Sequence, residues 1–423
     1  MKNIIYPVNQ QGLPLIPAAP VPAATVTNTK MGIGRLLQLY LRALLTAILT
    51  AIIAIGISGL TDRLMRFAFY GQWETGAESP AYHNLGAAVI LLPVAGSLLL
   101  LWAAVRNSNW LKIPGMILAT ATGGSLGKEA PAMLMGGMFG ILSGKKDHFL
   151  ETEQYTLFVA GACSGLAMLF GAPVAALLLA LEIWLPQWKW QQVLPAVIGA
   201  AVGGAGNYVI HHGNPVFHFG DGPAFNLPAL GVYFFIGLLA GLLAGGITRL
   251  YHVIQRLTAG SSSRNKGWIL AAALLTGLIG YLAPETLGAG DDYISNLLRA
   301  RVTLQLLFVW SVLKLVAWLF FAGVAKTGSS ITPVLITGGA VGLLLAVVIQ
   351  LIFPAIIINP VMAALIGMFA LFAGTSRALL AAIALGLETT HQWQASLPLV
   401  VACVAAYSLA VLVGRKRNVE AVR

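Results

Sequence analysis

The sequence predicts an all-α, polytopic membrane protein built from two related halves with discontinuous helices. Its 423 residues are 58% hydrophobic and only 9% charged, whereas a soluble globular domain has about 25% charged residues. Apolar stretches recur along almost the whole chain, and a helix needs about 20 such residues to cross the hydrocarbon core. A Gly-rich motif ending in proline is written twice within this apolar sequence, which indicates a repeated break in a membrane helix.

The apolar stretches define the expected organisation of the chain. They predict roughly ten or more spans and half-spans in a membrane domain over 34–414, with halves at 34–212 and 230–414. Residues 1–33 are rich in Pro, Ala and Thr and predict a disordered cytoplasmic tail, and residues 415–423 form a basic cytoplasmic tail. The apolar stretches are 40–60, 84–105, 155–181, 192–210, 230–249, 268–282, 303–325, 334–357, 361–387 and 396–413.

The charges indicate an orientation in a lipid bilayer and argue against a nucleic-acid partner. The net charge is +11, but the basic residues lie in short connections and form no patch with interleaved aromatic side chains. Basic residues beside membrane spans normally stay in the cytoplasm, so both termini are expected there. Cys163 and Cys403 lie in apolar runs and are expected to pack as small hydrophobic residues. The sequence has no spacing typical of a metal site, and nothing in it calls for a cofactor.

The duplicated motif is the feature that points most directly to function. The first copy, Gly-Lys-Glu-Ala-Pro, ends at Pro131, and the second, Gly-Ser-Ser-Ile-Thr-Pro, ends 202 residues later. Three glycines after each proline are displaced by the same 202 residues. Glu129 has no acidic counterpart, because the matching position is Ile331. A second related pair, Glu182 and Glu388, is displaced by 206 residues.

Each break is expected to lead into the start of a helix inside the membrane. Proline suits a first helical turn because it lacks the N–H that would be unpaired there, and irregular backbone is tolerated in lipid only where it is buried or lines a cavity. The free N–H groups and the positive end of the helix dipole attract an anion. The carboxylate of Glu129 can occupy the position of the anion, and on protonation it no longer competes with the anion for that position. The alternative is a simple helix cap or an ion pair with Lys128.

These residues resemble a known family. Residues 127–131 look like the Gly-(Lys/Arg)-Glu-Gly-Pro signature of the ClC family of chloride channels and proton/chloride antiporters. The similarity covers about residues 85–410, with several motifs in the family's order. The further segments that resemble family motifs are residues 161–167, 284–290, 328–333 and 373–388.

The resemblance implies a ClC-like inverted repeat of two halves with discontinuous and re-entrant helices. It also implies a homodimer with one anion pathway in each subunit. Glu129 would be the gating glutamate, with chloride and protons as the ions it meets. Glu182 would lie on a possible proton path, although its place at a helix end is also that of a structural cap. The backbone N–H groups expected to face the anion belong to Gly127, Lys128 and Ala130 in the first break and to Gly328, Ser330 and Ile331 in the second.

Three departures from the family pattern concern the coupling of proton movement to chloride movement. The Gly-Ser-Gly-Ile-Pro loop, which usually brings a serine to the central anion, is deleted, and Ser97 and Ser108 are open substitutes. Ile183 stands where antiporters usually have a second, inner glutamate. The tyrosine that helps to close the inner side is absent, since its expected place falls in the charged tail. Lys314, a lone cation in an apolar run, either raises the local anion concentration or pairs with a carboxylate.

The sequence therefore predicts transport of chloride or a similar small anion such as fluoride, gated by protonation of Glu129, in a proton-coupled exchanger. A passive voltage- or pH-gated chloride channel is the alternative, because Ile183 and the missing inner groups favour looser coupling. The paired breaks argue against a non-transporting scaffold. The lack of a catalytic triad or a P-loop in the sequence argues against a membrane enzyme. The short chain, with no soluble domain after the last span, indicates a bacterial inner-membrane protein.

Overall fold

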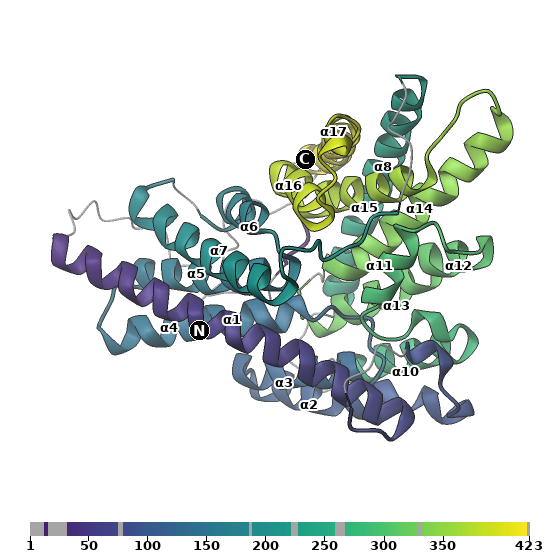
Figure 1. The fold of residues 1–423 in the computed structure, drawn as a ribbon. Helices are drawn as coiled ribbons and strands as arrows, with labels where there is room; N and C mark the ends of the chain where they lie inside the picture. The colour runs from purple at the N-terminus through teal and green to yellow at the C-terminus, as the bar shows by residue number, and fades with distance from the viewer. Residues whose placement is uncertain are drawn as a thin grey trace.

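The computed structural model describes residues 12–15, 32–74, 79–185, 188–220, 227–258, 267–328 and 331–420. These residues form helices joined by short connections, with no β-strand among them (Figure 1). Seven of the described helices are long and apolar enough to cross a membrane, and four shorter apolar helices accompany them. The predicted all-α fold with spans and half-spans is confirmed.

The helices form two series with the same order of parts. The first comprises α1 (Ile33–Tyr70), η1 (Pro80–Tyr82), η2 (Gly86–Ile90), α2 (Leu92–Arg106), α3 (Asn109–Ala121), α4 (Glu129–Lys146), α5 (Glu151–Phe170), α6 (Pro173–Leu179), η3 (Ala180–Trp184) and α7 (Trp190–His211). The second comprises α8 (Leu227–Leu257), α10 (Trp268–Leu282), η4 (Pro284–Thr286), α11 (Asp291–Leu297), α12 (Leu304–Phe308), η5 (Val309–Leu313), α13 (Lys314–Ala325), α14 (Ile331–Ile352), α15 (Pro360–Ser376), α16 (Leu379–Thr390), η6 (Trp393–Ala395) and α17 (Ser396–Glu420). Each series contains a long first helix (α1, α8), a hairpin (α4–α5, α14–α15), a short helix (α6, α16) and a last helix (α7, α17).

The glycines that follow each break let the helices of each hairpin touch backbone to backbone. A Cβ on Gly161 of α5 would lie 2.2 Å from the carbonyl oxygen of Gly136 on α4. In the second half, a Cβ on Gly367 of α15 would lie 2.2 Å from the carbonyl oxygen of Gly338 on α14. Small residues permit this close approach of membrane helices. Both hairpins therefore hold the starts of α4 and α14 in fixed positions.

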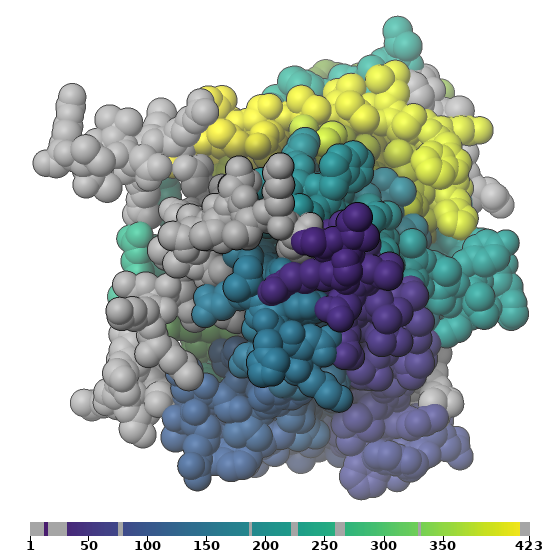
Figure 2. Space-filling view, turned by 90° about the vertical axis from the view of Figure 1, so that its left-hand side faces the viewer, coloured from purple at the N-terminus to yellow at the C-terminus, as the bar shows by residue number. Residues whose placement is uncertain are grey.

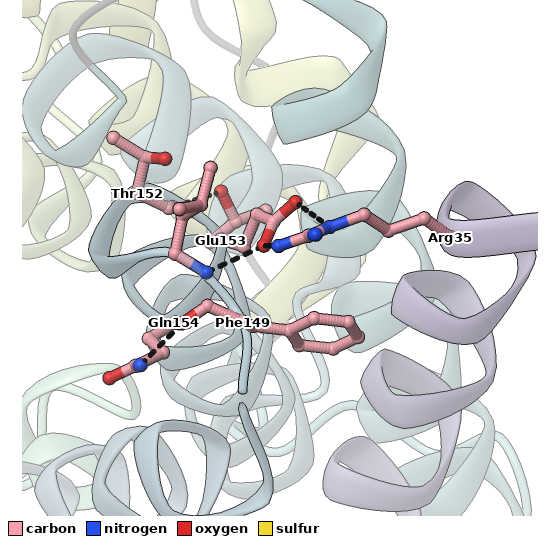
Figure 3. A network of polar contacts seen from close by, with 7 residues as sticks. Arg35, Phe149, Thr152, Glu153 and Gln154 are labelled. Carbon is pink, nitrogen blue, oxygen red and sulfur yellow. Dashed lines mark hydrogen bonds and ion pairs between the residues drawn. The ribbon is translucent and has the colours of Figure 1, made fainter. Parts of the chain in front are cut away.

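Two ion pairs fix the start of α1 against the connection between α4 and α5. The guanidinium of Arg35 donates to both carboxylate oxygens of Glu153, at 2.8 and 2.6 Å, and the N–H of Leu150 donates to the same carboxylate at 2.7 Å (Figure 3). Arg42 forms the same kind of bidentate ion pair with Asp147. The side of the molecule at which α1 and α5 begin is called the N-terminal face below. In Figure 2, which looks at this side, the purple first turns of α1 lie against blue residues of the first half.

The second half is inverted relative to the first. α5 runs from the N-terminal face to Phe170, whose ring centroid lies 6.2 Å from that of Phe217, shortly before α8 begins. Its counterpart α15 starts beside the first turns of α8, because the N–H of Asn359 donates to the hydroxyl of Tyr233 at 3.4 Å. α8 therefore begins near the end of α5, and α15 runs from that side back towards the N-terminal face.

Residues 12–15 of the predicted tail lie against the helices, and two of them are part of the core. Leu13 and Leu15 are each 3% exposed, and the N–H of Leu13 donates to the carbonyl oxygen of Thr375 at 2.8 Å. The prediction of disorder over residues 1–33 does not hold for residues 12–15, while residues 1–11 and 16–31 lie outside the described residues. Two leucines separated by one proline carry too little periodicity to be recognised as part of a core from the sequence.

Candidate anion site

Glu129, the first residue of α4, reaches across to the start of α14. Its carboxylate accepts a hydrogen bond from the N–H of Thr332 at 2.9 Å and another from the Thr332 hydroxyl at 3.2 Å. Glu129 is only 2% exposed. A helix start offers unpaired N–H groups and the positive end of the helix dipole, and here they hold a carboxylate. The side chain thus occupies a place that suits a free anion.

The two breaks use glycine for different reasons. A Cβ on Gly127 would lie 2.0 Å from Oε2 of Glu129, so the carboxylate folds over a position that admits no side chain. Gly328, in the second break, has a φ of +87°, in the left-handed region that favours glycine. Both glycines therefore permit the local backbone geometry of the breaks, and their place at an anion stays a prediction.

The hydroxyl that reaches Glu129 belongs to a residue next to the predicted backbone donors. The sequence predicts that the N–H groups of Ser330 and Ile331 face the anion, and the N–H and hydroxyl of the next residue, Thr332, hold Glu129. The backbone of Ile331 also interacts with this carboxylate, and its place at an anion stays a prediction. Ile331 and Ala130 are fully buried in the first turns of their helices, and Ser330 lies outside the described residues. Thr332 repeats the position of Ala130 at the 202-residue spacing, and its hydroxyl beside the break was the signal that sequence reasoning missed.

Lys128 is engaged by two other carboxylates. Its ammonium lies 2.6 Å from a carboxylate oxygen of Asp62 on α1 and 2.7 Å from one of Asp291 at the start of α11. The alternative of an ion pair between Lys128 and Glu129 is therefore not the arrangement observed. Two carboxylates more than offset this one charge, so the Glu129 carboxylate at the start of α14 is held by the N–H and hydroxyl of Thr332 and not by Lys128.

A cavity of about 350 Å³ adjoins Glu129 and Thr332. Its wall includes Phe170 at the end of α5, His211 at the end of α7, and Asp292 on α11. The cavity therefore lies on the side of Glu129 away from the N-terminal face. One water molecule takes up about 30 Å³ of liquid, so the cavity has room for a hydrated ion. An anion or a proton that enters it meets the carboxylate directly.

Glu182 and Glu388 cap helices of opposite halves. The carboxylate of Glu182, in the π-helical turn that continues α6, accepts from two N–H groups in the first turn of α16, at 3.0 and 2.9 Å. Glu388, near the end of α16, accepts from two N–H groups in the first turn of α6, at 3.0 and 2.8 Å. This is the geometry of a structural cap, which satisfies donors that have no partner within their own helix. A place for Glu182 on a proton path stays a prediction.

Lys314 binds a segment that contacts the loop before Glu129. Its fully buried ammonium donates to the carbonyl oxygens of Thr286 and Gly288, at 3.1 and 3.0 Å, and lies 5.3 Å from the ring centroid of Tyr293. The N–H of Gly288 in turn donates at 3.1 Å to the carbonyl oxygen of Gly123, in the loop that leads to α4. Lys314 therefore binds backbone carbonyls and fixes the segment against which the loop before Glu129 rests.

The two serines considered as replacements for the missing loop both have structural partners. The hydroxyl of Ser97 donates to the carbonyl oxygen of Pro93 at 2.7 Å, and that of Ser108 accepts from a first-turn N–H of α3 at 3.4 Å. Ser125, in the loop before α4, is fully buried, and its hydroxyl has no hydrogen-bond partner among the described residues. Of these three serines, Ser125 has the hydroxyl that is free to take a ligand.

This arrangement defines a class of protein: a helical membrane protein in which two inverted halves bring helix starts to one buried ionisable group, as ion transporters do. The family model described as voltage gated chloride channel matches residues 104–411. The chain belongs to this family, which confirms the resemblance that its motifs predict.

Relatives of this chain include bacterial exchangers. A protein named H(+)/Cl(−) exchange transporter ClcA from Vibrio cholerae serotype O1 (strain M66-2) is 29% identical over 314 residues, which cover 72% of this chain and 66% of the relative. One with the same name from Klebsiella pneumoniae is 28% identical over 317 residues, with the same coverage. The matching region thus spans slightly less than two thirds of the length of these relatives.

Solved structures share the fold along nearly the whole chain. A slow cyanobacterial Cl−/H+ antiporter aligns with a TM-score of 0.74 and 20% identity, covering 90% of this chain and 98% of the other. A CLC-type fluoride/proton antiporter aligns with a TM-score of 0.68 and 20% identity, covering 90% and 96%. At this identity the likeness concerns the fold, and it confirms the predicted ClC-like architecture.

Proposed function

We propose that this protein exchanges chloride for protons across a membrane, with Glu129 as the gate that both ions meet. The observation that carries the proposal is the carboxylate of Glu129 bound to the N–H and hydroxyl of Thr332. An anion that binds the start of α14 has to displace this carboxylate, and a protonated carboxyl group competes less well for N–H donors. Proton binding and anion binding at one place are then linked, as coupled exchange requires.

The relatives support the choice of ions. Two bacterial relatives are named H(+)/Cl(−) exchange transporters, and a structure with the same fold is a Cl−/H+ antiporter. Another with this fold is a fluoride/proton antiporter, so fluoride is the anion to compare with chloride.

We also propose that the protein works as a homodimer in a bacterial inner membrane, with both termini in the cytoplasm. Arg35 and Arg42 lie near the start of α1, and Lys145 and Lys146 end α4 on the same face. This basic face supports the orientation, because positive connections tend to stay in the cytoplasm. In this orientation the cavity beside Glu129 opens towards the outside.

Proton movement driven by a chloride gradient in proteoliposomes tests the proposal. We expect outward chloride flow through the wild-type protein to drive proton uptake against the proton gradient, and we expect Glu129→Gln to abolish that uptake. Glu151→Gln, which changes an exposed carboxylate on the N-terminal face, is the matched control and should keep the coupling. Chloride flow without proton movement would identify a passive channel, and no movement of chloride, fluoride or protons would overturn transport altogether.

A further inference from the structure

Residues 12–15 form a short buried segment that lies across the end of α15. Leu13 and Leu15 point into the core, with 3% of each residue exposed. The N–H of Leu13 donates to the carbonyl oxygen of Thr375 at 2.8 Å. A Cβ on Gly12 would lie 2.7 Å from the carbonyl oxygen of Ser376, so the backbone of the segment is in close contact with the end of the helix.

The 206-residue repeat relates this contact to one in the other half. Gly171 caps the end of α5 with a φ of +61°, and Arg377, 206 residues later, caps the end of α15 with a φ of +62°. The segment that lies against the end of α5 is residues 216–219: a Cβ on Gly171 would lie 3.2 Å from Val216. Residues 12–15 and 216–219 each precede the long first helix of their own half and pack on the end of a helix of the other half.

The position of one segment therefore predicts that of the other. Phe217, from residues 216–219, lines the cavity that leads to Glu129 from the side away from the N-terminal face. Because the halves are inverted, we infer from this symmetry that residues 12–15, which contact the end of α15, lie on the opposite side of Glu129. This is the side on which an ion would pass between the site and the N-terminal face.

We propose that Leu13 and Leu15 form the inner constriction of the ion pathway. The proposal rests on the transport function proposed above and adds the residues that close its cytoplasmic side. An apolar constriction opposes passage of an ion because the ion would have to lose water there without gaining polar contacts. At this place the segment supplies two large, buried apolar side chains.

Polar substitution of the two leucines tests the constriction. We expect Leu13→Ser combined with Leu15→Ser to raise chloride flux in proteoliposomes several-fold and to lower the number of protons moved per chloride. The control is Pro14→Ala, which changes the half-buried residue between them and should leave both quantities at wild-type values. Wild-type flux and coupling in the double serine variant would overturn the proposal while leaving the transport function intact. A wild-type protein that moves no ion would instead overturn the transport function.

Chemical labelling tests the same proposal without a polar side chain in the core. A Leu15→Cys variant is made in a chain whose native cysteines, Cys163 and Cys403, both fully buried, are replaced by alanine. We expect a charged, membrane-impermeant thiol reagent to block chloride flux when it is applied from the N-terminal face. Chloride should slow the reaction. If the cysteine is fully modified and flux is unchanged, residues 12–15 lie outside the pathway and the proposal fails.

Discussion

At the scale of single residues, the site depends on how Thr332 holds the carboxylate of Glu129. One of the two donors is a backbone N–H, which a side-chain substitution leaves in place, and the other is the hydroxyl at 3.2 Å. A hydrogen bond to a charged group contributes about 1.5–3 kcal/mol. The hydroxyl therefore biases the balance between a closed site, filled by the carboxylate, and an open one.

Removal of that hydroxyl should shift the pH dependence of transport. In Thr332→Val the ionised form of Glu129 loses a donor, which favours the protonated form, so the gate should open at higher pH. A loss of about 1.5 kcal/mol corresponds to about one pH unit. The measurement is chloride flux across a pH series. Thr337→Val on the same helix is the control, because its buried hydroxyl has no hydrogen-bond partner among the described residues; identical profiles for both variants would contradict the account.

At this scale the sequence identifies the carboxylate at the break but not all of the groups that donate to it. The unmatched carboxylate, Glu129, and the two break loops follow from a repeat that can be counted along the chain. Which groups donate to the carboxylate depends on the path of a few backbone atoms, so the part played by Thr332 could not be predicted from the sequence. The partners of Lys128 were also beyond reach, because Asp62 and Asp291 come from distant parts of the chain.

At the scale of elements, the two hairpins set the geometry of the site. α4 packs on α5 and α14 on α15 through glycines whose missing side chains leave room for the carbonyl oxygens of the neighbouring helix. Glycine in a helix interior costs up to about 1 kcal/mol relative to alanine. The close packing that it allows offsets this cost and keeps both helix starts aligned at Glu129.

A single methyl group should disturb this packing. In Gly367→Ala the new Cβ would meet the carbonyl oxygen of Gly338 at 2.2 Å, so the helices have to separate. We expect a loss of about 1–3 kcal/mol in the free energy of unfolding, measured in detergent, and reduced chloride flux. The control, Gly246→Ala on α8, places its Cβ where nothing lies within 4 Å and should leave stability unchanged or raise it by up to about 1 kcal/mol. Equal stability of the two variants would show that the contact does not constrain the hairpin.

At the scale of the whole molecule, each half contributes residues that pack on, or cap helices of, the other half. Glu182 and Glu388 cap each other's helices, and residues 12–15 and 216–219 each lie on the other half. Each half is therefore incomplete without its partner. The repeat in the sequence predicts two related halves. It does not show on which half residues 12–15 or residues 216–219 pack.

Matched substitutions of the two capping glutamates separate a structural role from a proton-path role. Glu182→Ala and Glu388→Ala each leave two N–H groups unpaired, and we expect each to lower the free energy of unfolding by about 1–2 kcal/mol. We also expect the ratio of protons to chloride to stay equal in the two variants. A ratio that falls only in Glu182→Ala would place Glu182 on the proton path, contrary to a pure capping role.

The central claim is that the carboxylate of Glu129 occupies the place in which chloride binds. Calorimetric titration of chloride into the purified wild-type protein and into Glu129→Ala tests it most directly, since binding is measured without transport. The account predicts tighter chloride binding in Glu129→Ala, because the start of α14 no longer has to be vacated, and an affinity that depends less on pH than in the wild type. Equal affinity and equal pH dependence in the two proteins would contradict it.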